Sequence, residues 1–534
     1  FLLYQLETRG IYVWLDGLSS RKLQEKDGIL SWNLLPPGLK GYIYFVPELQ
    51  RLHQDYLSAL WSHRNRYTGR QYRDTPSIVL TELFHDNNLH LDQPRIVPFS
   101  DLFRDRWSDY LQSQGEETSS PIDWKKPSVP LQKYVSMTMG MTFLDFFNFL
   151  RGFSVKIPIG STHAVTSIMD LPAITSLDFV HAEGVWNPPG IPVELYTDRP
   201  MYLTDTVKEG HLFSELAFNR RENKPFLVSK WGEPWPCTTR AEMPLWVAAM
   251  AGFQEWQGCI SSTYRSFHDT ETNSLYAPLE SFNDPCVMGL MPSAALLFFR
   301  GTVKPAKKTA VMNVVPDAVS DEPITPLSCQ TTRLVDTREI VVKIGNKASG
   351  KNVFSPTEPL DLLPDLHDID PKSSYRRDPE RGLVFIDTPE TQALIGCVKE
   401  SRFGDLPYLD VQTDEDFAVI SVSSLDKQPI QRAQELWIAI VSQAKNQGFR
   451  SEPVSDSSFQ VVENGHAPIM IRDTPVRLFI ASENSRWNIA VIDGNGNELQ
   501  TLPYQWEDGR LSFRAGIHGS LFYRLSCLSR SERK

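Results

Sequence analysis

The sequence predicts an α/β architecture built on parallel strands, followed by a β-sandwich. Up to about residue 300, short apolar runs alternate with segments of helical period. Polar and aromatic residues follow most of these runs, as is usual where parallel strands end. Beyond residue 300 the helical period disappears, and short apolar runs alternate with turn signals.

Six apolar runs in the first part of the chain are expected to form buried strands. They lie at 11–16, 76–84, 154–159, 176–180, 225–229 and 258–264. Helices are expected at 47–65, 139–151 and 244–256. This alternation is typical of a (β/α)8 barrel, in which functional residues lie at the carboxyl ends of the strands. Because only six of eight strands are visible, we expect the opening strands to lie upstream of Phe1.

The second part of the chain is expected to be all β. Turn signals such as Asp493–Gly496 and Asp508–Gly509 separate its apolar runs. Strands are expected at 340–344, 383–386, 417–422, 434–443, 475–481, 487–492, 511–513 and 521–525. Many short strands with turns between them are typical of a β-sandwich. The predicted domains are therefore a barrel over residues 1–300 and a β-sandwich over residues 301–534.

Composition and charge exclude several classes of protein. The 534 residues include 54 Lys and Arg against 65 Asp and Glu, a net charge of −11, whereas a general nucleic-acid binder needs a basic surface. No apolar run is long enough to span a bilayer. The six cysteines form no disulfide framework, and Cys237, Cys259 and Cys286 are expected to be buried thiols. The 13 Trp, 17 Tyr and 28 Phe exceed what a core requires, and such a surplus is common around ligand clefts.

Three segments of the first part carry distinctive residue patterns. Asn65 to Leu89 contains a helix end, a turn, a strand and the triplet His85-Asp86-Asn87. It resembles the fourth-strand region of β/α-barrel glycoside hydrolases of the cellulase clan, where an Asn-Glu-Asn triplet carries the general acid/base. Asp178 to Pro188 resembles the strand that ends in a His-Gly-x-Trp motif, and Lys224 to Pro236 resembles the seventh-strand segment. In the second part, residues 386–392 and 422–429 resemble the sandwich that follows such barrels.

The resemblance implies roles for the charged residues, and it also shows substitutions. It places Asp86 at the acid/base position, Lys230 at the position of the nucleophilic Glu, and Glu183 where the clan has a His. A retaining glycosidase needs two carboxyl groups about 5–5.5 Å apart, and a cationic lysine cannot form the glycosyl ester. We expect Glu183 and Lys230 to form an ion pair across the barrel mouth. Glu233 and Glu183 are the candidates for a displaced catalytic carboxylate.

Several residues near the strand ends are candidates for glycan binding: His85, Asn87, His181, Trp186, Trp231, Trp235 and Tyr264. Trp186 and Trp231 directly follow strand ends, where a sugar face could stack on them. A structural interpretation is also open, in which His85, Asp86 and Asn87 hold the rim by hydrogen bonds and the tryptophans are core. The spacing of His181 and Glu183 could support a metal, but no third ligand is evident, so neither a metal nor a cofactor is expected.

Two functions of different classes stay open. One is hydrolysis of a polysaccharide, with Asp86 as acid/base and Glu233 or Glu183 as the second carboxylate. The other is a degenerate glycosidase that binds a glycan or scaffolds a partner without cleaving it. A third interpretation is a fragment that is inactive because strands are missing. The expected partner is a polysaccharide or oligosaccharide, and the resemblance favours a secreted or periplasmic location. The oligomeric state is not predicted.

Overall fold

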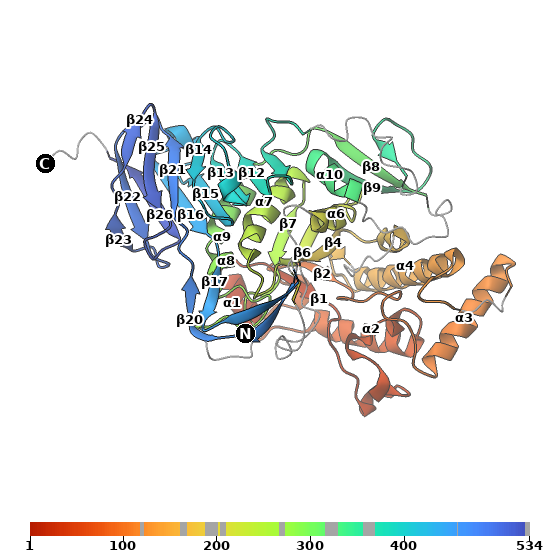
Figure 1. Ribbon diagram of the computed structural model, residues 1–534. Coiled ribbons are helices and arrows are strands. Elements are labelled where there is room, and N and C mark those ends of the chain that lie inside the picture. Colours follow the sequence, from red (N-terminus) through yellow and green to blue (C-terminus); the bar gives the residue numbers. More distant parts are fainter. Residues whose placement is uncertain are drawn as a thin grey trace.

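The computed structural model combines a centre of parallel strands with antiparallel sheets in its C-terminal part (Figure 1). It describes residues 1–117, 122–160, 168–186, 201–202, 210–265, 273–315, 329–355, 369–455 and 458–528. Among the helices in these ranges, none combines the length and the apolar character that crossing a bilayer requires.

Six parallel strands are present, and each overlaps one of the predicted ranges, but the third and fourth strands begin only at the last residue of theirs, Ile159 and Val180. They are β1 (Val13–Asp16), β2 (Ile78–Glu82), β3 (Ile159–Gly160), β4 (Val180–Val185), β6 (Phe226–Gly232) and β7 (Gly258–Ser261). They form two sheets in chain order, β1-β2-β3 and β4-β6-β7. A hydrogen bond of 3.0 Å from Asp178 N to Ile159 O joins the two sheets. Consecutive parallel strands in chain order are the arrangement that a β/α barrel uses.

Helices connect and cover these strands. They are α1 (Leu2–Thr8), α2 (Pro47–Ser62), α3 (Phe99–Gln114), α4 (Val129–Gly152), α6 (His211–Ala217), α7 (Met243–Phe253), α8 (Pro285–Met288) and α9 (Met291–Arg300). The predicted helices correspond to α2, α4 and α7. In α2 the apolar stripe of Leu49, Leu57 and Trp61 is buried, whereas α7 is apolar and buried nearly all round. Helices α2, α3 and α4 lie together, on the side away from the antiparallel sheets (Figure 1).

The chain beyond residue 300 begins with a further parallel sheet. Strand β8 (Thr309–Val314) lies between β9 (Glu339–Ile344) and β10 (Val353–Phe354), and both pairs are parallel. Helix α10 (Cys329–Thr337) precedes β9. The strand expected at 340–344 is present, but this segment differs from the antiparallel sandwich expected there. An apolar run predicts a strand without indicating the direction of its partner.

Two antiparallel sheets form the C-terminal part. The eight-stranded sheet has the order β11-β12-β13-β15-β16-β26-β22-β23, and the four-stranded sheet has the order β14-β21-β25-β24. Buried residues of both sheets, such as Ile420 and Ile438 of the first and Leu478 and Phe513 of the second, belong to one hydrophobic cluster. The two sheets therefore pack face to face. The strands are β11 (Tyr375–Asp378), β12 (Leu383–Asp387), β13 (Thr391–Gly396), β14 (Leu409–Gln412), β15 (Ala418–Ser424), β16 (Glu435–Val441), β21 (Val476–Ala481), β22 (Trp487–Ile492), β23 (Glu498–Thr501), β24 (Gln505–Glu507), β25 (Arg510–Ala515) and β26 (Phe522–Cys527).

A hairpin arm, residues 444–471, extends from the antiparallel sheets toward the parallel strands (Figure 1). In it, β17 (Ala444–Gln447) pairs with β20 (His466–Ile471), and β18 (Arg450–Ser455) pairs with β19 (Ser458–Glu463). Strand β19 also pairs with β5 (Met201–Tyr202), which follows β4 in the chain.

Side-chain hydrogen bonds fix the arm to two further loops. Asn446 Oδ1 accepts from Leu275 N at 2.7 Å, and Asn446 Nδ2 donates to Leu275 O at 2.8 Å. Trp235 Nε1 donates to Asn464 Oδ1 at 2.9 Å. Leu275 follows β7 and Trp235 follows β6, so the arm lies at the carboxyl ends of the parallel strands. These are the ends at which β/α folds carry their functional sites.

Candidate functional site

Charged side chains gather at the carboxyl ends of the parallel strands. Asp16 and Glu82 are the last residues of β1 and β2 and lie opposite each other in register. Glu183 of β4 lies opposite Lys230 of β6. With two histidines described next, these residues form what we call the mouth network: Asp16, Glu82, His85, His181, Glu183 and Lys230.

Glu82 is the buried centre of the mouth network. Its Oε1 lies 2.6 Å from His85 Nδ1, and its Oε2 lies 2.9 Å from His181 Nε2. Burial alone would raise the pKa of Glu82, but the hydrogen bonds that its carboxylate accepts from His181 and His85 lower it to about 2. The same hydrogen bond to Glu82 raises the pKa of His85 to about 9. At neutral pH Glu82 is therefore ionised and His85 is protonated.

Asp16 adds a second carboxyl group beside Glu82. The residue borders solvent, but burial of its carboxyl group, followed by the negative charge of Glu82, raises the pKa of Asp16 to about 7. Ligand atoms of Asp16, Glu82 and His85 all lie within 4.8 Å of one another. This spacing would allow a divalent cation. The positive charge of His85 and the hydrogen bond from His181 stabilise the Glu82 carboxylate without one.

The ion pair expected between Glu183 and Lys230 is present. Lys230 Nζ lies 3.3 Å from Glu183 Oε2, and His85 Nε2 lies 3.7 Å from Glu183 Oε1. Glu183 thus lies between two cations. The resemblance implies a nucleophilic carboxylate at residue 230. This position holds the Lys230 ammonium group, which is paired with Glu183 of the neighbouring strand β4.

A β-bulge explains how β6 presents two neighbouring side chains to the same region. Ala182 pairs with Val228 while Glu183 pairs with Lys230, so Ser229 is an extra residue on β6. A bulge re-aims the side chains around it. Ser229 Oγ lies 2.9 Å from His181 Nδ1, and the next residue, Lys230, reaches Glu183.

Asp86 and Asn87 lie in the loop after β2, because that strand ends at Glu82. Asp86 has a φ of 47°, in the left-handed region that Asp tolerates better than most residues, and its Oδ2 lies 2.7 Å from Lys40 Nζ. Asn87 is buried; its Oδ1 accepts from Gly41 N at 2.9 Å, and its Nδ2 donates to Gly38 O at 3.2 Å. Asn87 therefore holds a loop backbone, in line with the structural interpretation of this residue.

Glu233 lies in a buried pocket of the loop after β6. Its Oε1 accepts from Thr239 Oγ1 at 2.9 Å, and it forms a hydrogen bond with the Cys237 thiol. Only 3% of its surface is exposed. A general acid or nucleophile must reach the substrate, so this burial argues against a catalytic Glu233.

The aromatic residues near the strand ends differ from the expected open platform. Trp186, Trp231 and Trp235 are only 5%, 4% and 2% exposed. Tyr264, which follows β7, is 62% exposed, and its ring stands edge-on to Phe282 at 5.4 Å. Of the aromatic residues predicted to bind glycan, Tyr264 is the one whose ring is open to a ligand.

Four residues of this region are not among the sequence-based candidates: Asp16, Lys40, Glu82 and Ser229. Asp16 had a readable signal, because it is the last residue of a predicted strand and so stands at the functional end. Lys40 and Asp86 are far apart in the sequence, and only the folded chain brings their side chains into contact. The bulge that directs Ser229 toward His181 leaves no mark in the apolar pattern. Of the cysteines predicted to be buried thiols, Cys237 and Cys286 are buried and Cys259 is half-buried.

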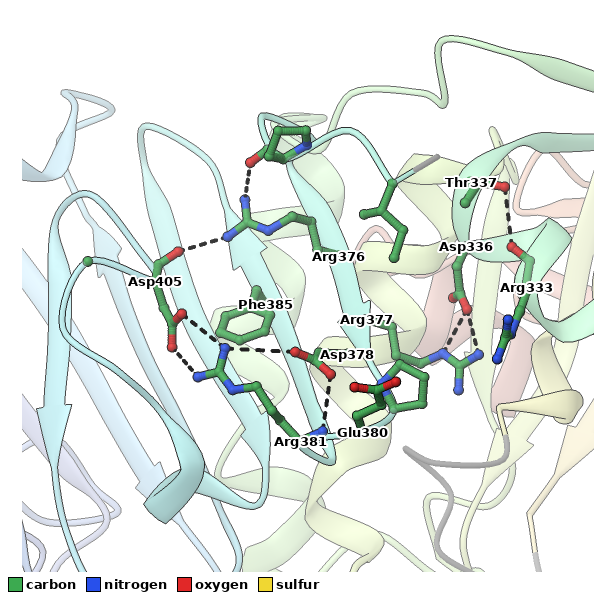
Figure 2. A pocket seen from close by; sticks show the side chains of 14 residues that line it. Arg333, Asp336, Thr337, Arg376, Arg377, Asp378, Glu380, Arg381, Phe385 and Asp405 are labelled. Carbon is green, nitrogen blue, oxygen red and sulfur yellow. Dashed lines mark hydrogen bonds and ion pairs between the residues drawn. The ribbon is translucent and has the colours of Figure 1, made fainter. Parts of the chain in front are cut away.

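A separate hollow of about 680 Å³ lies between α10 and the antiparallel strands β11 and β12 (Figure 2). Arg377 Nε donates to Asp336 at 2.7 Å, and Arg381 Nη1 donates to Asp405 at 3.0 Å. The guanidinium groups of Arg376 and Arg381 each lie 5.4 Å from the ring centre of Phe385. Because these arginines are already matched by carboxylates or aromatic rings, the hollow is best understood as a charge-balanced junction between α10 and the sheet.

Comparison with known proteins gives matches among solved structures. No protein-family model matches the sequence, and no curated protein matches it. The chain is similar to the endo-β-1,4-mannanase from Thermotoga petrophila, with 10% identity, a TM-score of 0.34, and coverage of 97% of this chain and 82% of that chain. It is also similar to a catalytic mutant of a GH42 β-galactosidase from G. stearothermophilus, with 10% identity, a TM-score of 0.37, and coverage of 91% and 82%. The β-galactosidase from Bacillus circulans sp. alkalophilus gives 10% identity, a TM-score of 0.35, and coverage of 91% and 83%. Because all three identities are 10%, the function proposed below rests on this chain's own residues.

Proposed function

We propose that this protein binds a glycan at the mouth network and does not cleave it by the retaining glycosidase mechanism. One observation carries the proposal: Lys230 stands at the position that the clan resemblance gives to the nucleophile, and its ammonium is paired with Glu183 at 3.3 Å. An amine so engaged cannot form a glycosyl ester, and its charge opposes the positive charge that develops on the sugar. Asp86, at the acid/base position, is engaged with Lys40.

The proposal extends to the architecture. The six parallel strands belong to a (β/α)8-type barrel, and the antiparallel sheets, which begin at β11, are its accessory β-sandwich. Face-to-face packing of the two sheets and the chain order of the six parallel strands support this assignment.

A saccharide ligand is supported by the hydrogen-bonding side chains of the mouth network and by an exposed aromatic ring in the loop after β7. Glu183 and Lys230 offer an acceptor and a donor for sugar hydroxyls, and they can exchange their mutual contact for contacts with a ligand. Tyr264 supplies an exposed ring on which the face of a sugar could stack. Opposite charges side by side suit a neutral polyhydroxyl ligand, because neither sign of charge is left in excess.

The test is calorimetric titration of the full chain with neutral plant and microbial oligosaccharides, with reducing ends measured in the same samples. We expect saturable binding without new reducing ends. Tyr264→Ala should weaken binding about tenfold, the loss of one stacking contact, while Tyr264→Phe should bind like the wild type. Absence of binding across the panel, or equal affinity of Tyr264→Ala, would contradict the proposal.

A second candidate function is hydrolysis with a relocated acid. Asp16 favours it, because a carboxyl group whose pKa is raised to about 7 can donate a proton near neutral pH. Glu183 would then act as base. Release of reducing ends by the wild type, abolished by Asp16→Asn and by Glu183→Gln, would establish this function in place of the first.

A further inference from the structure

Ser229, His181 and Glu82 form a continuous hydrogen-bonded chain beneath the mouth. Ser229 Oγ lies 2.9 Å from His181 Nδ1, and His181 Nε2 lies 2.9 Å from Glu82 Oε2. A hydroxyl, an imidazole and a carboxylate linked in this order are the parts of an activated serine nucleophile. Such constellations are recognised by geometry and role on unrelated folds.

The charge on Glu82 sets the tautomer of His181. A carboxylate accepts hydrogen bonds but does not donate them, so neutral His181 carries its proton on Nε2, where Glu82 accepts it. The lone pair of Nδ1 then faces Ser229 and can take the hydroxyl proton. The other acceptor near Ser229 Oγ, the carbonyl of Ala182, is farther away at 3.3 Å.

The three residues of this hydrogen-bonded chain differ in their exposure to solvent. Ser229 lies on the bulge of β6 and is partly exposed, whereas His181 and Glu82 are each only 1% exposed. A nucleophile must meet its substrate, while its base is best held rigidly and away from water. The side chain of Lys230, the residue after Ser229, places a positive charge in the same region of the mouth. Negative charge that develops on a carbonyl oxygen would be stabilised there.

We propose that Ser229 is a nucleophile, with His181 as its base and Glu82 as a positioning residue, and that it hydrolyses an acyl ester carried by a sugar hydroxyl. That the substrate is an ester of a sugar rests on the glycan ligand of the proposed function. The assignment of Ser229 as a nucleophile does not depend on it. This activity removes an acyl group and leaves glycosidic bonds intact, so it needs none of the carboxylates that the clan resemblance places at the mouth.

The reaction balances with water as the only co-reactant. Ser229 Oγ attacks the ester carbonyl carbon while its proton passes to His181 Nδ1. The tetrahedral intermediate collapses, the bond to the sugar oxygen breaks, and that oxygen takes the proton from His181. Water, deprotonated by His181, then attacks the acyl-serine; the bond to Ser229 Oγ breaks, Oγ takes the proton back from His181 Nδ1, and the carboxylic acid leaves.

The test begins with labelling of the full wild-type chain by a fluorophosphonate probe, which reacts with activated serines. We expect peptide mass spectrometry to find the label on Ser229, and we expect heat-denatured protein to remain unlabelled there. This measurement needs no variant, so misfolding of a mutant cannot obscure it. An unlabelled Ser229 in native protein would overturn the proposal.

Ester hydrolysis gives the second arm, with p-nitrophenyl acetate and an acetylated oligosaccharide as substrates. Ser229→Ala should lower kcat/KM by about 10³-fold or more, and Ser261→Ala, a matched serine on the neighbouring strand β7, should leave it unchanged. Equal rates for Ser229→Ala and wild type would overturn the proposal. Labelling and p-nitrophenyl acetate turnover without acetate release from the oligosaccharide would support the nucleophile and overturn the sugar ester as its substrate, while the glycan binding of the proposed function is decided separately by calorimetry.

Discussion

Replacing Asp284 by alanine is expected to loosen the attachment between the hairpin arm and the loops of the parallel strands. Asp284 and Arg240 form a buried ion pair, with Nε to Oδ2 at 2.6 Å and Nη2 to Oδ1 at 3.1 Å. Arg240 also donates to the carbonyl of Cys237 and to that of Ala444, the first residue of the arm, both at 2.9 Å. One guanidinium group therefore joins the loop after β6, helix α8 and the arm.

The free-energy cost of Asp284→Ala can be estimated from the interactions that the substitution removes. Arg240 is 1% exposed, so removing Asp284 leaves a buried charge without its counter-ion, which typically costs about 3–5 kcal/mol. Asp284 Oδ1 also caps α8 by accepting from Cys286 N at 2.9 Å, and loss of such a cap costs about 1 kcal/mol. The two losses together amount to about 4–6 kcal/mol, and every 1.4 kcal/mol is a tenfold change in an equilibrium constant, so local opening should become about seven-hundredfold to about twenty-thousandfold more frequent.

Hydrogen exchange followed by mass spectrometry measures this directly in peptides covering α8 and β17. Asp284→Asn is the matched control, because Asn still caps the helix and offers one acceptor while removing the charge. We expect its exchange to rise less than that of Asp284→Ala. Less than a tenfold rise for Asp284→Ala would refute the reasoning that this pair holds the arm.

Three further predictions concern titration and reactivity. Burial lowers the pKa of His53 to about 3, so the folded state binds fewer protons than the unfolded state below about pH 6.5, and stability should fall by about 2 kcal/mol from pH 7 to pH 5. In urea unfolding, the free energy of unfolding of His53→Phe should depend much less on pH between 7 and 5. An unchanged pH dependence would contradict the assignment to His53. The pKa of Asp16 is raised above its unfolded value, so its contribution to stability is present below about pH 4 and lost as the pH rises through 7; Asp16→Asn should therefore be stabilising at pH 8 and neutral at pH 4. Burial raises the pKa of the Cys286 thiol to about 12 and that of Cys237 well above its ordinary value, so neither should react with a thiol reagent before unfolding.

The sequence predicts the approximate positions of the six parallel strands and of helices α2, α4 and α7, because these depend on local apolar patterns, whereas α3, α6 and α9 are not among the predicted helices. Strand β6 and helix α7 are examples in which a compact apolar segment bounded by polar residues identifies the element. The sheet formed by β8, β9 and β10 and the return of the arm to β5 depend on pairing between distant segments. Such pairings follow from topology and register, which the local pattern does not contain.

At the mouth network, the sequence predicts which charged residues pair, but not how far the side chains around them are buried. The Glu183–Lys230 ion pair follows from two strand-end charges in neighbouring strands, and it is confirmed. The exposure of Trp231 could not be predicted in the same way, because a tryptophan just beyond a predicted strand, 225–229 here, fits a core and a cleft equally well; in the structure it lies within β6 and is buried. The link from Ser229 to His181 depends on a bulge of a single residue, which the apolar pattern does not reveal.

The central claim, that the mouth binds a glycan while Lys230 prevents retaining hydrolysis, is tested most directly by counting reducing ends. The wild type and the double variant Lys230→Glu with Asp86→Glu are incubated with an oligosaccharide that the wild type binds. We predict no new reducing ends with the wild type, and their appearance only when both carboxylates are restored. Reducing ends released by the wild type at a rate that Lys230→Glu does not change would contradict it.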